Sequence, residues 1–214
     1  MPWSSNRTFL VELCLDGATA HAVYKPGRGE RPLWDFPGGL YRREVAAFEL
    51  SEALGWDLVP LTIERENVPM GEGSLQWFVD ADFDQHYFTL IESARWRSQL
   101  EHICAFDILV NNTDRKSGHC LLDDDGHIWA IDNGLSFHAE FKLRTVIWDF
   151  GGEDIPQAIQ GDIERLLSDG LPDGVARYLD TFERDAVLVR ARALLREGRF
   201  PVDRSGRRYP WPLV

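Results

Sequence analysis

Two aspartate-containing motifs flank one short hairpin in this 214-residue chain, and their order constrains the fold more than any other feature. The hairpin is predicted from apolar runs at residues 120–122 and 127–131, joined by an Asp-Asp-Asp-Gly turn. Asn-Thr-Asp-Arg, containing Asp114, precedes the hairpin, and Asp-Asn-Gly, beginning at Asp132, follows it. Because the two ends of a hairpin meet at one edge, we expect these two carboxylates to lie close together.

Strand and helix signals are divided unevenly along the chain. Residues 1–80 predict the order strand, strand, helix, strand, strand, at residues 8–15, 18–24, 41–54, 59–64 and 74–80. The remainder predicts helices at residues 92–110, 156–167 and 175–196, and in the last of these the apolar residues at helical spacing are Val175, Tyr178, Leu179, Phe182, Ala186 and Val189. We therefore expect an α+β fold of two lobes around a cleft, with a strand-rich N-lobe at 1–80 and a mainly helical C-lobe at 81–214.

Composition excludes several classes of protein. The net charge of −12 disfavours nonspecific binding to nucleic acid and adhesion to anionic lipid, because a phosphate backbone repels an acidic surface. The sequence contains no run of 18 apolar residues, so no membrane-spanning helix is predicted, and the N-terminus lacks the apolar core of a signal peptide. The three cysteines, Cys14, Cys104 and Cys120, lack CxxC spacing and are expected to be small buried residues in a reducing compartment. These features predict a cytoplasmic protein.

The paired aspartates indicate phosphoryl transfer. An aspartate such as Asp114, in a polar loop after a helix, can accept a hydrogen bond from an attacking hydroxyl, while Arg115 fixes the loop or meets a phosphate. Asp132, at the end of an apolar strand, offers the hard oxygen ligand that Mg²⁺ prefers when it also binds substrate phosphates. Kinases hold Mg²⁺–ATP and orient the hydroxyl with such a pair.

Two residues of the first half extend this interpretation. Lys25 ends the second predicted strand and Glu44 lies early in the next helix, which matches the strand lysine and helix glutamate that kinases use at the ATP phosphates. A G-x-G-x-x-G loop is missing between the first two strands, so phosphate coverage by backbone N–H groups is the weakest part of the pattern. Walker A, H-E-x-x-H and G-x-S-x-G motifs are also missing, and the Asp-rich turn lacks the ligand spacing of a calcium loop.

At these residues the chain resembles the phosphatidylinositol 3-/4-kinase superfamily, especially the compact type II phosphatidylinositol 4-kinases and small actinobacterial kinase-related proteins. The blocks that carry the resemblance occur in family order at residues 23–26, 43–48, 54–55, 59–62, 73–76, 112–115 and 130–137. The resemblance implies a minimal protein-kinase-like fold that binds ATP. It implies that Lys25 binds the phosphates with Glu44 as its partner, and that a linker strand holds adenine, formed by Gln76, Trp77, Phe78 and Val79.

By the same resemblance, Asp114 would be the catalytic carboxylate, with Arg115 beside it, and Asp132 the metal-binding residue of a D-x-G element. Residues 136–148 would form the segment that contacts substrate. His119 stands where these kinases place a metal-binding asparagine. Imidazole suits Mn²⁺ or Zn²⁺ better than Mg²⁺, so His119 predicts an altered metal preference, a one-ion site or weak transfer activity.

The leading hypothesis is an ATP-dependent phosphotransferase that uses Mg²⁺ or Mn²⁺ and acts on the hydroxyl of a protein or of a soluble small molecule. The alternative is a pseudokinase, a nucleotide-binding module with little or no turnover, which the substitution at His119 and the poor glycine loop favour. Lipid phosphorylation is disfavoured by the acidic charge and by the lack of a palmitoylated Cys-rich insert. Transfer of AMP instead of phosphate is a third possibility.

Overall fold

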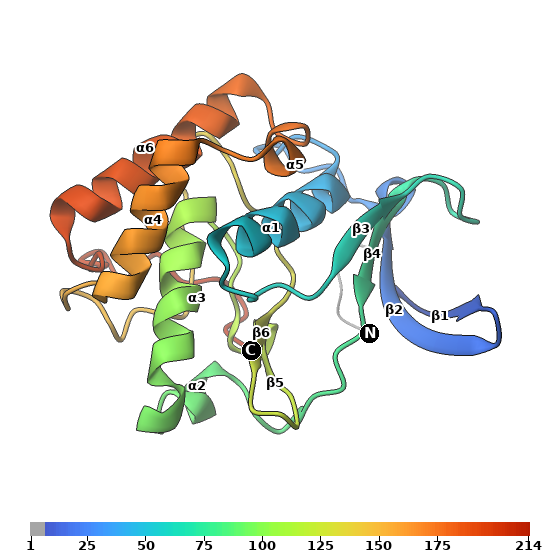
Figure 1. Cartoon of the computed structure of the whole chain (residues 1–214), viewed down its shortest axis with the longest axis horizontal. Helices are drawn as coiled ribbons and strands as arrows, with labels where there is room; N and C mark the ends of the chain where they lie inside the picture. The colour runs from blue at the N-terminus through green and yellow to red at the C-terminus, as the bar shows by residue number, and fades with distance from the viewer. Residues whose placement is uncertain (1–6) are drawn as a thin grey trace.

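The computed structural model describes residues 7–214 and contains a four-stranded antiparallel sheet beside a larger helical part (Figure 1). The strands are β1 (Phe9–Leu15), β2 (Ala18–Pro26), β3 (Thr62–Arg65) and β4 (Gly73–Trp77), in the spatial order β1-β2-β4-β3. Helix α1 (Leu40–Leu54) lies between this sheet and the remaining helices in Figure 1. The predicted α+β class, with its strand-rich and helical parts, is confirmed.

The two faces of strand β2 have different roles: one packs in an apolar cluster and the other presents Lys25. It pairs with β1 on one side and with β4 on the other, where Lys25 lies opposite Ser74. Ala22 and Tyr24 are buried and pack with Leu75 of β4 in a small apolar cluster. Because successive side chains of a strand point to opposite faces, Lys25 faces the other side of the sheet, towards α1.

Helix α1 begins and ends where local signals place it. Glu30 accepts hydrogen bonds from the backbone N–H groups of Gly39 and Tyr41, at 2.8 Å each, and so satisfies two donors at the start of the helix. Gly55 ends the helix with a φ of 72°, a left-handed conformation that costs glycine nothing. The sequence predicted this stop.

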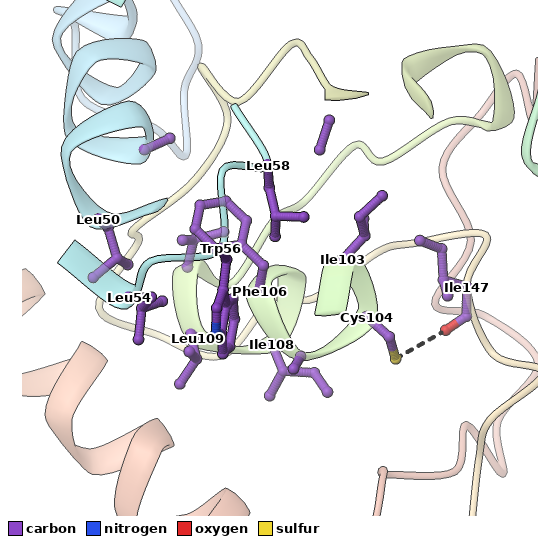
Figure 2. Close-up of a cluster of buried hydrophobic side chains, with 14 of the residues drawn as sticks. Leu50, Leu54, Trp56, Leu58, Ile103, Cys104, Phe106, Ile108, Leu109 and Ile147 are labelled. Atoms are coloured by element: carbon purple, nitrogen blue, oxygen red, sulfur yellow. Dashed lines mark hydrogen bonds between the residues drawn. The ribbon is translucent and has the colours of Figure 1, made fainter. Parts of the chain in front are cut away.

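The helical part contains the hairpin of β5 (Cys120–Leu122) and β6 (Ile128–Ala130) between helices; the helices are α2 (Tyr87–Leu90), α3 (Arg97–Val110), α4 (Gln157–Asp169), α5 (Asp173–Ala176) and α6 (Thr181–Glu197). Figure 2 shows that its core reaches into α1: Leu50 and Leu54 lie near Phe106 and Leu109 of α3. This contact fixes α1 against the helices, so the position of its N-terminal half is set by the main core.

Two helix predictions were wrong in their limits. The segment 92–110 is divided, because a 3₁₀ turn at Ala94–Trp96 precedes α3. The segment 175–196 is two helices, because Asp180 accepts a hydrogen bond from Glu183 N–H and starts α6 afresh with a capping box. Phe182 and Val189 are consequently 75% and 58% exposed and take no part in the predicted apolar stripe.

The cysteine prediction holds for two of the three residues. Cys104 and Cys120 are buried in the main core, and the Cys104 thiol approaches the Ile147 carbonyl oxygen at 3.7 Å (Figure 2). Cys14 is exposed instead, because it lies on the edge strand β1, most of whose side chains face solvent. Within residues 7–214, every helix is too short or too polar to cross a bilayer.

Candidate active site

A cleft of about 490 Å³ lies between the sheet and the two ends of the β5–β6 hairpin. All the candidate catalytic, nucleotide-binding and metal-binding residues predicted from the sequence, except Arg115, line this cleft: Lys25, Glu44, Gln76, Trp77, Phe78, Val79, Asp114, His119 and Asp132. These residues come from β2, α1, β4 and the segments on either side of the hairpin. The fold therefore brings together functional side chains that are more than a hundred positions apart in the sequence.

Lys25 is the centre of a three-residue ionic contact. Its ammonium donates to Glu44 Oε1 through a short contact and to Asp132 Oδ1 at 2.9 Å. Burial on its own would lower the pKa of Lys25, but the charges of Asp132 and Glu44 and their hydrogen bonds raise it above its ordinary value. Lys25 in turn lowers the pKa of Asp132 well below the usual range of a carboxyl group. At neutral pH the site therefore holds the Lys25 ammonium against an ionised Asp132 carboxylate.

Glu44 joins the two sides of the cleft. Its side chain is almost fully buried, and its second oxygen, Oε2, accepts a hydrogen bond from the Asn133 backbone N–H at 2.9 Å. One carboxylate thus fixes the Lys25 side chain on the sheet and the backbone after Asp132 on the hairpin. Asp132 itself has a φ of 59°, an uncommon conformation for a residue other than glycine, and this strain is held by the contacts around it.

Asp114 lies in the loop of residues 111–119, which we call the catalytic loop. The Asn112 side-chain oxygen accepts a hydrogen bond from the Asp114 backbone N–H at 2.9 Å and fixes the turn. The Asp114 carboxylate forms a short ion pair with Lys116, which the sequence reasoning did not identify. Burial raises the pKa of Asp114 and the neighbouring Asp132 raises it further, while Lys116 acts in the opposite direction. A raised pKa makes Asp114 a better proton acceptor than a solvated aspartate.

Arg115 is fully buried and does not line the cleft. Its guanidinium donates to the Asp107 carboxylate, to the Ile131 carbonyl oxygen at 2.5 Å and to Asn133 Oδ1 at 2.6 Å. These bonds tie α3, the catalytic loop and the D-x-G element into one unit. Of the two roles considered from the sequence, the geometry favours fixing the loop over meeting a phosphate.

Asp107 is a second residue that sequence reasoning missed. It lies on α3, is fully buried, and accepts hydrogen bonds from Arg115 and from the Thr145 hydroxyl at 3.0 Å. Burial raises the pKa of Asp107, and the charge of Arg115 opposes that effect. The one signal in the sequence was an acidic residue inside an otherwise apolar helical run, since a buried charge requires a partner. Thr145 belongs to residues 136–148, so this pair also positions the predicted substrate-contacting segment.

Asp132 suits a divalent cation better than His119 does. The Asp132 side chain is half exposed and faces the cleft with Asp114, and Mg²⁺ requires only one or two carboxylates besides phosphate oxygens and water. Among residues 7–214 no three His, Cys, Asp or Glu side chains gather into a complete metal site. Substrate phosphates would therefore have to supply part of the coordination.

His119 is neutral and already has partners. Burial lowers the pKa of His119 to about 4, with Asp132 opposing the shift. Its Nδ1 accepts a hydrogen bond from the Lys116 backbone N–H at 3.3 Å, so the ring proton is on Nε2, which faces Asp132 Oδ2 at 3.5 Å. Binding a metal through Nε2 would require loss of the bond to Lys116. The geometry thus favours His119 as a neutral neighbour of Asp132 over a metal ligand.

The predicted linker strand follows one wall of the cleft. Gln76 is buried and donates to the Thr62 hydroxyl at 2.9 Å, which fixes β4 against β3. The backbone N–H groups of Trp77 and Phe78 are bonded to Leu61 and His21 carbonyl oxygens. The Val79 N–H has no acceptor among the described residues, and it borders the cleft. A free donor at this position is what an adenine ring needs.

The β1–β2 turn does not contribute to the cleft. Asp16 and Gly17 form it with φ values of 50° and 85°, the conformation of a tight hairpin turn. Figure 1 shows the hairpin extending from the body of the molecule, and the cleft is bordered by other residues. The poor glycine pattern noted in the sequence therefore corresponds to a turn that does not reach the site.

Comparisons with known proteins bear on the family and the fold of the chain. The phosphatidylinositol 3- and 4-kinase model matches residues 46–167, more than half of the chain, a range that includes Asp114 and Asp132 but begins after Lys25 and Glu44. The chain is 37% identical to Protein Rv2133c of Mycobacterium tuberculosis over an alignment of 247 residues, which covers 98% of this chain and 88% of that protein.

Two solved structures share the fold. Fam20 from hydra, solved with sugar, superimposes with a TM-score of 0.55 at 13% identity and covers 91% of this chain and 81% of its own. The proinflammatory kinase CtkA of Helicobacter pylori gives a TM-score of 0.50 at 10% identity, covering 92% and 90% of the two chains. With the family match across its catalytic loop and D-x-G element, the chain belongs to the phosphatidylinositol 3- and 4-kinase family.

Proposed function

We propose that this protein is an ATP-dependent phosphotransferase that acts on a hydroxyl group of a protein or of a soluble small molecule. The observation that carries the proposal is the contact of one ammonium, Lys25, with both Glu44 and Asp132, in a cleft that also contains Asp114. Family membership and the fold support a phosphotransferase of the kinase type. The acceptor class and full catalytic competence are our proposal.

Each residue has a defined task in this mechanism. Lys25 binds the phosphates, and Glu44 holds its ammonium in place. The free Val79 N–H donates to adenine. Asp114 accepts the proton of the acceptor hydroxyl as the acceptor oxygen bonds to the γ-phosphorus; the bond from that phosphorus to the β–γ bridging oxygen breaks, and ADP leaves. A Mg²⁺ or Mn²⁺ ion bound by Asp132 would supply positive charge to the phosphate oxygens.

The test is label transfer from γ-labelled ATP with Mg²⁺ or Mn²⁺ supplied separately. We expect Asp114→Asn to reduce transfer or ATP hydrolysis by about 10²- to 10⁴-fold, the usual contribution of a positioned base, and Asp132→Asn to reduce it with either metal. Asp124→Asn is the matched control, since Asp124 is an exposed carboxylate in the turn of the same hairpin. Equal loss in the control, or no loss in Asp114→Asn, would contradict the mechanism.

A pseudokinase remains the second candidate for two reasons. The Lys116 N–H already occupies His119 Nδ1, which disfavours metal binding by His119, and the β1–β2 turn does not border the cleft, which leaves the phosphates less enclosed. It predicts that a non-hydrolysable ATP analogue binds equally well to the natural protein and to Asp114→Asn, with no turnover in either. Calorimetric titration of both proteins measures this. Transfer of AMP would be recognised by mass spectrometry, because a nucleotide adds far more mass to the acceptor than a phosphoryl group.

A further inference from the structure

A second pocket, of about 370 Å³, adjoins the nucleotide cleft, and Asp114 lines both. Besides Asp114, its walls include Thr113 of the catalytic loop, Lys142 and Arg144 of the following segment, and Tyr209 and Trp211 near the C-terminus. A carboxylate shared by two cavities lies where an acceptor hydroxyl in one would meet a phosphoryl group from the other. The volume is typical of a pocket that encloses a small molecule.

The only cation of this pocket without a partner among residues 7–214 is Arg144. Lys142 lies 3.7 Å from the Asp35 carboxylate and also donates to the Asp35 carbonyl oxygen. The Arg144 guanidinium is exposed and makes no hydrogen bond or ion pair with any described residue. In a chain with a net charge of −12, an unpaired arginine on a pocket wall is a site for an anion from outside.

The backbone of Arg144 is fixed while its side chain is free. The Arg144 N–H donates to the Asn112 carbonyl oxygen at 2.9 Å, and the Arg115 N–H donates to the Arg144 carbonyl oxygen at 3.1 Å. These bonds attach Arg144 directly to the catalytic loop on both sides of Asp114. An anion bound by Arg144 would therefore be held at a defined position relative to the catalytic carboxylate.

The C-terminal segment, residues 208–214, builds the opposing wall. The Arg208 carbonyl oxygen accepts hydrogen bonds from the Thr145 N–H and the Trp148 indole, each at 3.1 Å, and the Leu213 carbonyl oxygen accepts one from the Ser117 N–H at 2.8 Å. The segment is thus held at both ends. Trp211 is 88% exposed at the pocket and presents a large apolar face on which a carbon skeleton can lie.

We propose that this pocket is the acceptor site and that it selects a small anionic hydroxyl compound, whose anionic group binds Arg144 and whose carbon skeleton lies against Tyr209 and Trp211. This inference rests on the proposed function, since it names the acceptor class of the same site. In the reaction, the compound's hydroxyl oxygen bonds to the γ-phosphorus of ATP, its proton passes to Asp114, and ADP departs with the bridging oxygen.

The test measures equilibrium binding by ligand-observed NMR, in the presence of Mg²⁺ and a non-hydrolysable ATP analogue. The probes are glycerol, ribose, glucose and inositol, each compared with its monophosphate. We expect at least one monophosphate to bind while its neutral parent does not. Arg144→Ala should weaken that binding roughly tenfold or more, as expected for loss of a charged hydrogen bond, and Arg144→Lys should restore part of it. Arg192→Ala, an exposed arginine of α6 away from the pocket, is the matched control and should have no effect.

Equal binding of charged and neutral probes, or binding insensitive to Arg144→Ala, would overturn the proposal. So would silence of all eight probes, or binding only to an acidic serine peptide or to vesicles of phosphatidylcholine with phosphatidylglycerol. ATP hydrolysis that depends on Asp114 is measured in parallel. Hydrolysis without monophosphate binding would exclude the proposed acceptor class and leave the phosphotransferase function. If a monophosphate binds but ATP is neither hydrolysed nor used to phosphorylate it, the function would be excluded and only a binding pocket would remain.

Discussion

The catalytic loop and the β1–β2 hairpin both correspond to regions that lie near ATP in kinases, but different interactions hold them in place. The catalytic loop is held by side chains: Asn112 caps it, and the fully buried Arg115 bonds it to α3 and to the D-x-G element. The hairpin is held mainly by its backbone ladder, and most side chains of β1 are exposed.

This difference indicates where the molecule is preorganised. Groups that act on a reacting bond must be fixed before the substrate arrives, and networks of satisfied buried hydrogen bonds achieve that. A strand pair with one exposed edge can vary without disturbing the core. We therefore expect substitutions around Arg115 to damage the fold and the chemistry together, and substitutions of the exposed side chains of β1 to damage neither.

Arg115→Met should have the largest effect. The methionine fills part of the space but leaves the Asp107 carboxylate buried without its cation, which typically costs about 3–5 kcal/mol. Unfolding in urea, followed by tryptophan fluorescence, measures the loss. Arg192→Met provides the control for removing an exposed arginine. A loss within about 0.5 kcal/mol of that control would mean that the catalytic loop is not held by this network.

Glu44→Gln should have the next largest effect, on catalysis more than on stability. The neutral amide weakens the contacts with Lys25 and with the Asn133 N–H, and hydrogen bonds to charged groups are worth about 1.5–3 kcal/mol. We expect kcat/KM for ATP to fall by roughly 10- to 100-fold. Glu52→Gln, on the exposed face of the same helix, is the control. Unchanged kcat/KM in Glu44→Gln would contradict the role of α1 in the site.

Lys116→Ala should change the pH dependence. Asp114 must be ionised to accept a proton, so activity should fall as the pH drops through its pKa. Lys116 lowers that pKa, and its removal should therefore move the acidic limb of the kcat/KM profile to higher pH. Because partly exposed ion pairs are worth up to about 1 kcal/mol, the rate on the plateau should change by less than about tenfold. A limb that stays in place would assign it to another group.

Local signals in the sequence predicted most of the fold. The Asp-rich turn, the stop at Gly55 and the order of strands and helices depend on residues near one another in the chain, and the structure has them. The break before α6 was missed because the apolar spacing continues across it, while the capping box of Asp180 and Glu183 starts a new helix there. Period alone does not distinguish one long helix from two short ones.

The site was only partly predictable for a related reason. Lys25, Glu44, Asp114 and Asp132 were identified because motifs and a family resemblance pointed to them, and the fold places them in one cleft. Whether Arg115 faces substrate or core depends on Asp107, which lies on another element and carries no motif. The acceptor pocket depends on the C-terminal segment returning to the catalytic loop, which no local pattern encodes.

Leu15→Ser should have the smallest effect and tests the other half of the comparison. Leu15 is 75% exposed beside the β1–β2 turn, so replacing it should change the free energy of unfolding by no more than about 0.5 kcal/mol. Because the turn does not border the cleft, KM for ATP should also stay unchanged. Steady-state kinetics with varied ATP measures this, and Leu109→Ala, in the main core, shows that the assay detects a destabilising change. If KM rises several-fold in Leu15→Ser while stability does not change, the hairpin folds over the phosphates when nucleotide binds, and the contrast between the two regions holds only for the free protein.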